Sequence, residues 1–391
     1  MRIGIDARFY GPTGKGLGRY TQEIVDNVIK IAGTSSDSGL EFVVFLSPAN
    51  FDEFTADNPE VKKVKVFCSW YSWQEQIFMP FFLWREKLDL IHFPHFNVPI
   101  LTPMKFVVTI HDLILTHFPT IRATTKSRWL YSLKNLAYRL VIFTALHRAK
   151  KIIAVSEFTK NDIIKKFRIN PDKIVVTYEG VANLSKGRDT LFVSKLNNQE
   201  VLSQYRIPNN YLLYVGNAYP HKNLEALLRV FSKIRSDYPE LRLVLVGKSD
   251  YFYERIKAEA KSLNIWQKEN SNSPVIFPGY VPDAQLEILY AEARAYIFPT
   301  LYEGFGLPPL EAMANGCPVI SSNCSSLPEI LGPAALYFSP NKEAEMISQI
   351  KFLINNQEKK EELRILGRQQ IKKYNWWECA NKTLDIYKQS L

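Results

Sequence analysis

The sequence predicts an α/β protein of two domains, each built on a largely parallel sheet. Short apolar runs, typical of buried strands, alternate with helical patterns in both halves of the chain. The chain has 391 residues, more than one ordinary hydrophobic core usually includes. Residues 183–210 lose this periodicity and gain polar side chains, so we place the interdomain boundary there. We expect a ligand cleft between the two domains.

Composition and charge point to a folded protein with anionic partners. Hydrophobic residues make up 46% of the chain and aromatic residues 13%, which argues against disorder. The formal net charge is +10 and the pI about 9.2. That balance favours a phosphorylated ligand, an acidic membrane surface or nucleic acid, although a basic protein with no special partner is also consistent with it.

The cysteines and the first residues of the chain indicate in which cellular compartment the protein is expected. The four cysteines, Cys68, Cys317, Cys324 and Cys379, form no C-x-x-C pair, which argues against a zinc site or a disulfide scaffold. Residues 1–11 run directly into a strand pattern and show no signal peptide. The densest apolar run, residues 77–84, is far shorter than the ~20 residues of a membrane-spanning helix. We therefore expect a cytoplasmic protein, either soluble or peripheral at the inner face of the membrane.

The first half begins with a strand and a glycine-rich loop. This loop contains Gly11, Gly14, Gly16 and Gly18 and precedes a helix. It matches neither the dinucleotide fingerprint nor the Walker loop, so a phosphate or acceptor loop and a simple tight turn both stay open. The strands predicted in this half are residues 2–7, 42–46, 90–93, 106–110, 151–155 and 173–177.

Two further features of the first half are candidates for function. His111 lies at the carboxyl end of a predicted strand, where open α/β sheets bind ligands, although a structural role is about as consistent. Residues 122–151 form a helical segment in which Trp and Leu interleave with basic side chains. It is either a solvated helix face or a surface for an anionic membrane. The basic residues are Arg122, Lys126, Arg128, Lys134, Arg139, Arg148, Lys150 and Lys151.

The second half repeats the alternation of strands and helices. Its predicted strands are residues 212–215, 241–246, 275–277, 295–298 and 318–321. The tail, from about residue 341 to residue 391, is predicted to be helical. Its tryptophans, Trp376 and Trp377, are expected to be packing residues and not site residues.

Residues 295–316 predict a strand, a glycine loop and a helix that begins at Pro308. The backbone N–H groups of a helix N-terminus favour a phosphate. Yet Glu303 and Glu311 flank this position, and an ionised carboxylate only accepts hydrogen bonds, for example from hydroxyl groups. A phosphate between two hydroxyl-rich groups describes a nucleotide sugar.

In these motifs the chain resembles the retaining glycosyltransferases of family 4, which have the GT-B fold of two facing Rossmann-like domains. Four segments carry the resemblance in order: Gly16-Leu17-Gly18-Arg19-Tyr20, Thr109-Ile110-His111-Asp112, Val215-Gly216 through Pro220-His221-Lys222-Asn223, and the E-x7-E pattern from Glu303 to Glu311. The resemblance implies an acceptor-side domain at residues 1–190 and a nucleotide-sugar domain at residues 207–370. A C-terminal helix, residues 371–391, would return to the first domain.

The resemblance also implies roles for individual residues. Its catalytic set is His111, Glu303 and Lys222. Its diphosphate set is Gly16, Asn217, Lys222, Gly304, Phe305, Gly306 and Leu307, and its nucleoside set is Glu311, Tyr280 and Val281. Glu303 would contact donor-sugar hydroxyls, and Lys222 would offset charge on the leaving diphosphate. Asn217 and His221 stand where many relatives have basic residues, so Lys222 and backbone N–H groups would form most of the clamp, with His221 contributing only if protonated.

The implied activity is transfer of a hexose-type sugar, with retention, from a UDP-sugar or GDP-mannose to a growing polysaccharide or lipid-linked glycan of the bacterial type. No D-x-D aspartate pair occurs in the sequence, so we expect no metal and no cofactor. A nucleotide-sugar epimerase of the same fold is the alternative enzyme, and a nucleic-acid-binding protein, for which the sequence has no motif, is a weaker one. The sequence leaves the base and sugar of the donor, the acceptor, the linkage and the oligomeric state open.

Overall fold

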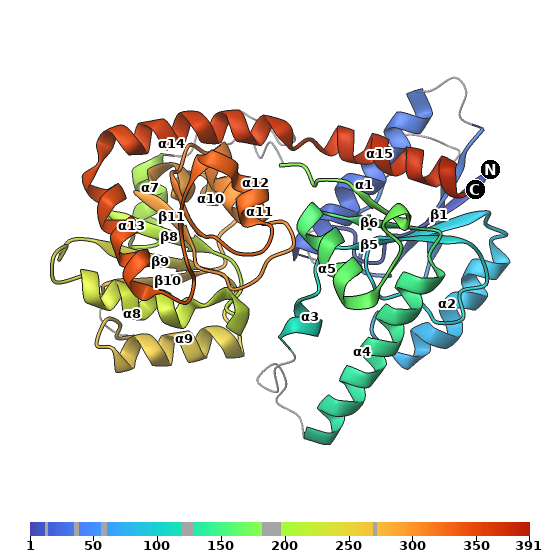
Figure 1. Cartoon of the computed structure of the whole chain (residues 1–391), viewed down its shortest axis with the longest axis horizontal. Coiled ribbons are helices and arrows are strands. Elements are labelled where there is room, and N and C mark those ends of the chain that lie inside the picture. The colour runs from blue at the N-terminus through green and yellow to red at the C-terminus, as the bar shows by residue number, and fades with distance from the viewer. Residues whose placement is uncertain (12–14, 35–38, 56–60, 119–127, 182–196, 269–271) are drawn as a thin grey trace. The chain divides into compact units, whose positions relative to one another are not determined.

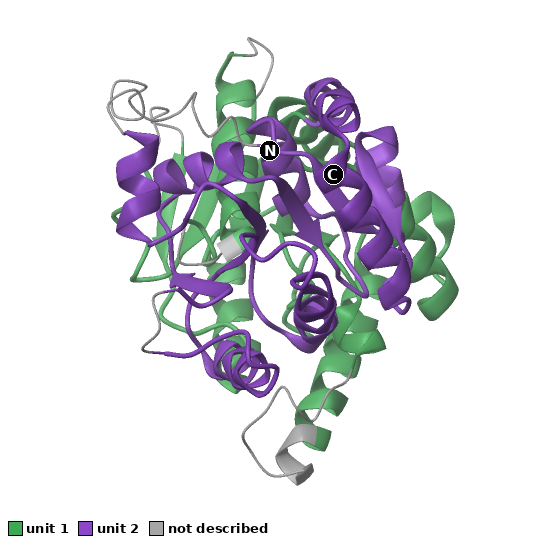
Figure 2. Ribbon diagram, turned by 90° about the vertical axis from the view of Figure 1, so that its left-hand side faces the viewer, with its two compact units in different colours: residues 1–180, 375–391 green, residues 181–374 purple. Residues whose placement is uncertain are grey.

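The computed structural model describes residues 1–11, 15–34, 39–55, 61–118, 128–181, 197–268 and 272–391; of residues 15 and 128–131 it describes the backbone. The chain forms two compact units (Figure 2). The first unit contains residues 1–180 and 375–391, and the second contains residues 181–374. Each unit is an α/β structure around one parallel sheet.

The sheet of the first unit has seven parallel strands. They are β1 (Arg2–Asp6), β2 (Glu41–Leu46), β3 (Val61–Lys65), β4 (Leu90–Phe93), β5 (Phe106–Ile110), β6 (Lys151–Ala154) and β7 (Ile174–Val176). Their order across the sheet is β3-β2-β1-β4-β5-β6-β7. Ile3 of β1 pairs with Phe42 on one side and Leu90 on the other, so β1 lies inside the sheet.

Helices cover both faces of this sheet. They are α1 (Lys15–Thr34), α2 (Trp73–Arg85), α3 (Ile114–His117), α4 (Arg128–Arg148), α5 (Glu157–Phe167) and α15 (Trp376–Ser390), with a 3-10 turn η3 (Pro171–Lys173). On one face, Ile24 of α1 and Leu384 of α15 share a core with Ile3 and Ile5. The opposite core contains residues of α2 and α4. The C-terminal helix therefore packs beside α1 in the first unit (Figure 1).

The sheet of the second unit has six parallel strands. They are β8 (Tyr211–Val215), β9 (Arg242–Val246), β10 (Val275–Gly279), β11 (Ala295–Phe298), β12 (Val319–Ser322) and β13 (Ala335–Phe338), in the order β10-β9-β8-β11-β12-β13. The helices are α7 (Asn198–Gln204), α8 (Leu224–Ile234), α9 (Tyr251–Ser262), α10 (Asp283–Glu292), α11 (Leu307–Ala314), α12 (Leu327–Leu331), α13 (Glu343–Asn355) and α14 (Gln357–Gln370). The 3-10 turns are η4 (Pro220–Lys222), η5 (Gly332–Ala334) and η6 (Ile371–Lys373).

The predicted α/β class, with two parallel sheets and a C-terminal helix that returns to the first half, is confirmed. Each predicted strand is present, with ends that differ by at most a few residues. The structure adds β3 and β13, which the sequence pattern did not predict. Both are edge strands, and β3 has the sequence VKKVK, whose lysines are typical of an edge protected against further pairing.

The length and polarity of the helices show whether any of them could span a membrane. Within the described ranges, no helix combines the length and the apolar character needed to cross a bilayer.

Candidate active site

An ion pair at the carboxyl edge of the second sheet joins two of the predicted site residues. Lys222 ends η4, which follows β8, and Glu303 lies in the loop after the neighbouring strand β11. The distance from Lys222 Nζ to Glu303 Oε2 is 2.5 Å, and the side chains are only 11% and 17% exposed. Nζ also lies 5.4 Å from the centroid of the Phe298 ring. Topology therefore brings together two charges that are 81 positions apart in the chain.

The loop from Glu303 to Leu307 enters α11 through a left-handed glycine. Gly306 is the N-cap with φ +99°, a backbone conformation that favours glycine, and a Cβ there would also press on Leu327 Cδ2 at 2.9 Å. Pro308 and Pro309 follow at the start of the helix and have no N–H group. The backbone N–H groups at this helix end therefore come from residues 304–307. They are fewer than a helix start without prolines would provide.

Hydroxyl side chains hold this loop in place. Ser326 Oγ donates to the carbonyls of Glu303 and Phe305 at 3.1 and 3.2 Å. Thr300 Oγ1 donates to the carbonyl of His221 at 3.0 Å, which ties the loop to η4. The sequence analysis missed both residues, although Thr300 lies two residues after the predicted strand β11, where a hydroxyl side chain was a usable signal.

The predicted nucleoside residues occupy different environments in the second unit. Glu311 lies in α11, is 9% exposed and accepts a hydrogen bond from the Tyr290 hydroxyl at 3.4 Å. Tyr280 follows β10 and is 70% exposed, whereas the Val281 side chain is buried. A ligand could therefore contact the exposed ring of Tyr280. At Val281, where the side chain is buried, it could contact only the backbone.

The turn between β8 and α8 contains Asn217, another of the predicted diphosphate residues, and His221. Asn217 Oδ1 accepts from the Tyr219 N–H at 3.3 Å, and its carbonyl accepts from the Tyr214 hydroxyl at 2.7 Å. Burial, and then the charge of Lys222, lower the pKa of His221 to about 3. His221 is therefore neutral near pH 7. It could contribute to the diphosphate clamp only if protonated, so it adds no positive charge there.

In the first unit, His111 is held at both ring nitrogens. Nδ1 lies 2.9 Å from Glu179 Oε1, and Nε2 lies 2.9 Å from the carbonyl oxygen of Pro94. Burial alone would lower the pKa of His111, but the hydrogen bond and charge of Glu179 outweigh it and raise the pKa above its usual value. Because both partners are acceptors, the arrangement favours an imidazolium that donates twice.

Sequence reasoning missed Glu179 as the partner of His111, although an acid that closely follows a predicted strand was a usable signal. Gly16 lies in the first turn of α1, and no heavy atom is within 4 Å of a Cβ built there. One turn later in α1, the Tyr20 ring meets the His111 ring edge to face, with centroids 4.5 Å apart. Tyr20 therefore brings α1, the helix whose first turn contains Gly16, into contact with His111.

Part of the predicted basic segment can be described. Arg122 and Lys126 lie outside the described residues, and the side chain of Arg128 is not described. Lys134, Arg139 and Lys150 are exposed on or directly after α4. Exposed apolar side chains alternate with them along the helix: Leu133, Leu136, Leu140 and Phe143.

Comparisons with known proteins identify the class to which a chain with these two parallel sheets belongs. The family model described as "Glycosyl transferases group 1" matches residues 198–370, and the model described as "Glycosyltransferase Family 4" matches residues 31–182. The chain belongs to the family 4 glycosyltransferases and is a glycosyltransferase.

Two curated relatives and one solved structure show this kinship. The chain is 32% identical to the O-antigen chain mannosyltransferase B of Escherichia coli over 314 residues, which cover 78% of this chain and 75% of the relative. It is 27% identical to the O-antigen chain mannosyltransferase RfbU of Salmonella typhimurium, over 72% of this chain and 69% of the relative. A sucrose-phosphate synthase from Thermosynechococcus elongatus superposes with a TM-score of 0.75 at 18% identity, covering 100% of this chain and 98% of that one. This likeness shows the GT-B fold.

Proposed function

We propose that the protein transfers a hexose, with retention of anomeric configuration, from a nucleotide diphosphate sugar to a growing polysaccharide or lipid-linked glycan. Both relatives described above bear the name of O-antigen chain mannosyltransferases. That shared name favours GDP-mannose over a UDP-sugar as the donor.

The observation that carries this proposal is the ion pair of Lys222 with Glu303. It puts a cation and a hydrogen-bond acceptor side by side, next to the backbone N–H groups of residues 304–307. The cation suits a diphosphate oxygen and the carboxylate suits sugar hydroxyls. We assign Gly304, Phe305, Gly306, Leu307 and Asn217 to the diphosphate.

The nucleoside is assigned to Glu311, inside α11, and to the turn after β10. Glu311 would accept hydrogen bonds from the ribose hydroxyls. Tyr280 and the backbone of Val281 would meet the base. From the first unit, we assign Gly16 to the diphosphate and His111 to the surroundings of the reacting sugar. Both N–H groups of the imidazolium are already donated, so it would act through its positive charge, which can stabilise negative charge developing on the leaving diphosphate.

Retention is proposed to follow front-face attack. The bond from the anomeric carbon to the diphosphate oxygen breaks while the acceptor oxygen approaches from the same face, and the departing phosphate oxygen takes the acceptor proton. Glu303 then positions the sugar and is not a nucleophile. Its close pairing with Lys222 fits this role, because the ion pair makes the carboxylate a poorer nucleophile.

We propose that this chemistry needs no metal ion. Lys222 and the backbone donors of residues 304–307 would supply the positive potential on the diphosphate. In the described parts of the chain, no three His, Cys, Asp or Glu side chains are grouped so that they could hold a metal. Metal independence stays a prediction, which activity in excess chelator tests.

We further propose that the enzyme works at the inner face of the membrane, bound by α2 and α4. The exposed side of α2 has five large apolar side chains: Trp73, Ile77, Phe78, Phe81 and Trp84. Exposed aromatic side chains on α2 and cations on α4 fit the interface of an anionic bilayer. No partner role is proposed for nucleic acid.

A thermal-shift screen of GDP, UDP, ADP and their sugars tests the donor. A ligand at 100 times its Kd adds ~2.7 kcal/mol to the free energy of unfolding. We expect GDP-mannose to raise the Tm most. Stabilisation by UDP-sugars alone would contradict the mannose donor, and an altered donor sugar recovered without any acceptor would indicate an epimerase.

A further inference from the structure

Four aromatic rings gather in the first unit where β1 and β4 end. Phe9 follows β1, Trp70 and Tyr71 precede α2, and His95 follows β4. The rings of Phe9 and Trp70 are stacked with centroids 4.2 Å apart, and Phe9 lies 5.7 Å from His95. The His95 ring lies 6.4 Å from the His111 ring, at an interplanar angle of 26°. The group therefore adjoins the residue that we assign to the reacting sugar.

The outer part of this group combines apolar faces with neutral polar edges. Tyr71 is 57% exposed, and its hydroxyl lies 3.3 Å from the His95 ring nitrogens. Burial, and then the charge of His111, lower the pKa of His95 to about 3, so its ring is neutral. A pyranose ring has the matching surface, with an apolar C–H face and a rim of hydroxyl groups.

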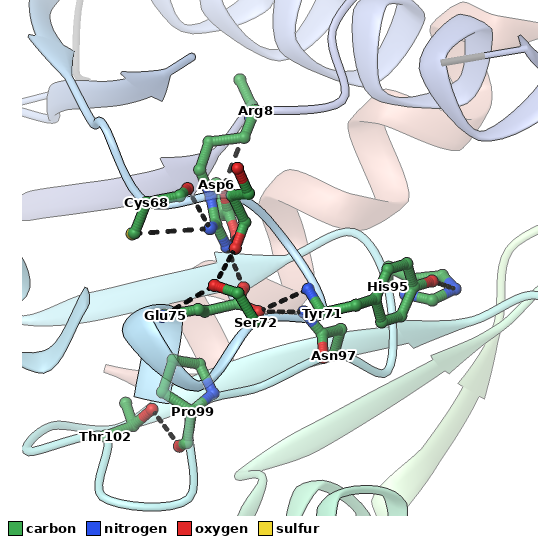
Figure 3. Close-up of polar contacts among 12 residues, drawn as sticks. Asp6, Arg8, Cys68, Tyr71, Ser72, Glu75, His95, Asn97, Pro99 and Thr102 are labelled. Carbon is green, nitrogen blue, oxygen red and sulfur yellow. Dashed lines mark hydrogen bonds and ion pairs between the residues drawn. The ribbon is translucent and has the colours of Figure 1, made fainter. Parts of the chain in front are cut away.

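The backbone of Tyr71 is in a conformation that a bulky residue rarely adopts. Its φ is +59°, in the left-handed region. The Tyr71 N–H donates to Glu75 Oε2 at 2.9 Å, and the Asn97 amide donates to the same oxygen at 2.6 Å. The other carboxylate oxygen of Glu75 forms an ion pair with Arg8, as Figure 3 shows.

The anchor of this turn is a buried cluster of charges. Arg8, Asp6 and Glu75 are at most 3% exposed. Burial alone would lower the pKa of Arg8, but Asp6 and Glu75 outweigh it and raise the pKa. Such a cluster has a large desolvation cost. Here it holds an exposed ring on a strained backbone, and such an outlier points to a function of that ring.

We propose that Tyr71, with Trp70 and His95 beside it, forms a platform that binds a pyranose ring of the acceptor glycan, and that Phe9, which is only 7% exposed, supports the platform by stacking on Trp70. Glu75 and Arg8 are positioning residues, because they act through the backbone of Tyr71. The proposal rests on the proposed function and names the acceptor side of the same reaction.

Two substitutions at one position test the ring without adding backbone strain. Tyr71→Phe keeps the ring and the left-handed backbone, whereas Tyr71→Gly removes the ring and also relieves the strain. Trp377→Ala is the control, because Trp377 is a 39% exposed aromatic residue of the same unit outside this group. The measurements are saturation-transfer NMR with a mannose oligosaccharide, the acceptor KM and the Tm.

We expect the wild type, Tyr71→Phe and Trp377→Ala to show saturation transfer to the sugar C–H protons. Tyr71→Gly should lose it and raise the acceptor KM roughly 3- to 10-fold, the range that corresponds to one aromatic contact. Its donor KM should stay within about twofold and its Tm should not fall. A wild-type protein that does not bind the oligosaccharide, or a Tyr71→Gly variant that binds it normally, would overturn the platform.

Vesicle binding and sugar transfer, measured on the same protein samples, distinguish two further outcomes. If Tyr71→Gly loses binding to anionic vesicles and keeps binding to the oligosaccharide, the rings contact lipid and the proposal is wrong. If the wild type binds the oligosaccharide through Tyr71 but transfers sugar from no donor, the platform stands and the proposed transfer reaction fails.

Discussion

At the scale of residues, Lys222 and Glu303 have a largely buried ion pair in the second unit, and breaking such a pair leaves an uncompensated charge. The same two side chains are assigned to the two parts of the donor that meet at the breaking bond. A loss of activity must therefore be separated from a loss of stability.

Lys222→Ala should lower kcat by ~10²–10³-fold, since this is the usual cost of removing one preorganised donor that stabilises transition-state charge. Lys233→Ala is the matched control, because Lys233 forms an ion pair with Glu343 at 2.7 Å on the exposed surface of the same unit. Steady-state kinetics and thermal unfolding of both variants make the measurement. A drop of only about twofold in a folded Lys222→Ala protein would remove Lys222 from the clamp.

Glu179 should make stability depend on pH through His111. The pKa of His111 is raised above 6.5 in the folded state, so the pair's contribution is fully present below pH 6.5 and is lost as pH rises through the raised value. We expect Glu179→Gln to lower the free energy of unfolding more at pH 6 than above the raised pKa. Denaturant unfolding over this pH range measures it, and an equal loss at every pH would contradict the imidazolium.

At the scale of elements, α2 has one side that packs in the core and an opposite side that exposes apolar side chains. Ser72 caps its first turn by accepting from the Glu75 N–H at 3.2 Å, and Met79 and Leu83 enter the core. The opposite side exposes Phe81 and Trp84. The S-x-x-E spacing of residues 72–75 is a helix-start signal that the sequence analysis did not use.

Replacing Phe81 and Trp84 by Ala should weaken binding to phosphatidylglycerol vesicles by ~10-fold or more, because each removed side chain takes apolar area out of the interface. Phe352→Ala in α13, where the aromatic ring is 46% exposed, should bind as the wild type does. Vesicle flotation at low and high salt makes the measurement. Equal flotation of all three proteins would show that α2 does not contact the bilayer.

Local patterns allowed the elements of the sheets to be predicted, but not the contacts between them. The loop at residues 303–307 could be recognised because its glycines and prolines fix the backbone locally. The pairing of His111 with Glu179 could not, because the two residues are 68 positions apart and meet only through the order of the strands. The edge strand β3 was missed because its lysines interrupt the apolar signal of a buried strand. The edge strand β13, with the sequence ALYF, has that signal and is as long as strands that were predicted, so it could have been recognised.

At the scale of the whole molecule, each unit supplies its own part of the proposed reaction. The second unit has the paired charges and the glycine loop, and the first has His111 with the aromatic group beside it. The α15 helix ties the end of the chain to the first unit, where Trp376 leaves so little space at Gly180 that a Cβ would lie 2.3 Å from the Trp376 backbone nitrogen. The proposed transfer reaction requires both units.

The stereochemistry of the product tests the central claim most directly. The protein is incubated with GDP-α-mannose and a mannose oligosaccharide, with and without excess chelator, and the new linkage is assigned by NMR. We predict an α-linked product formed at the same rate in both samples. A β-linked product, or a reaction that the chelator abolishes, would contradict the retaining, metal-independent mechanism.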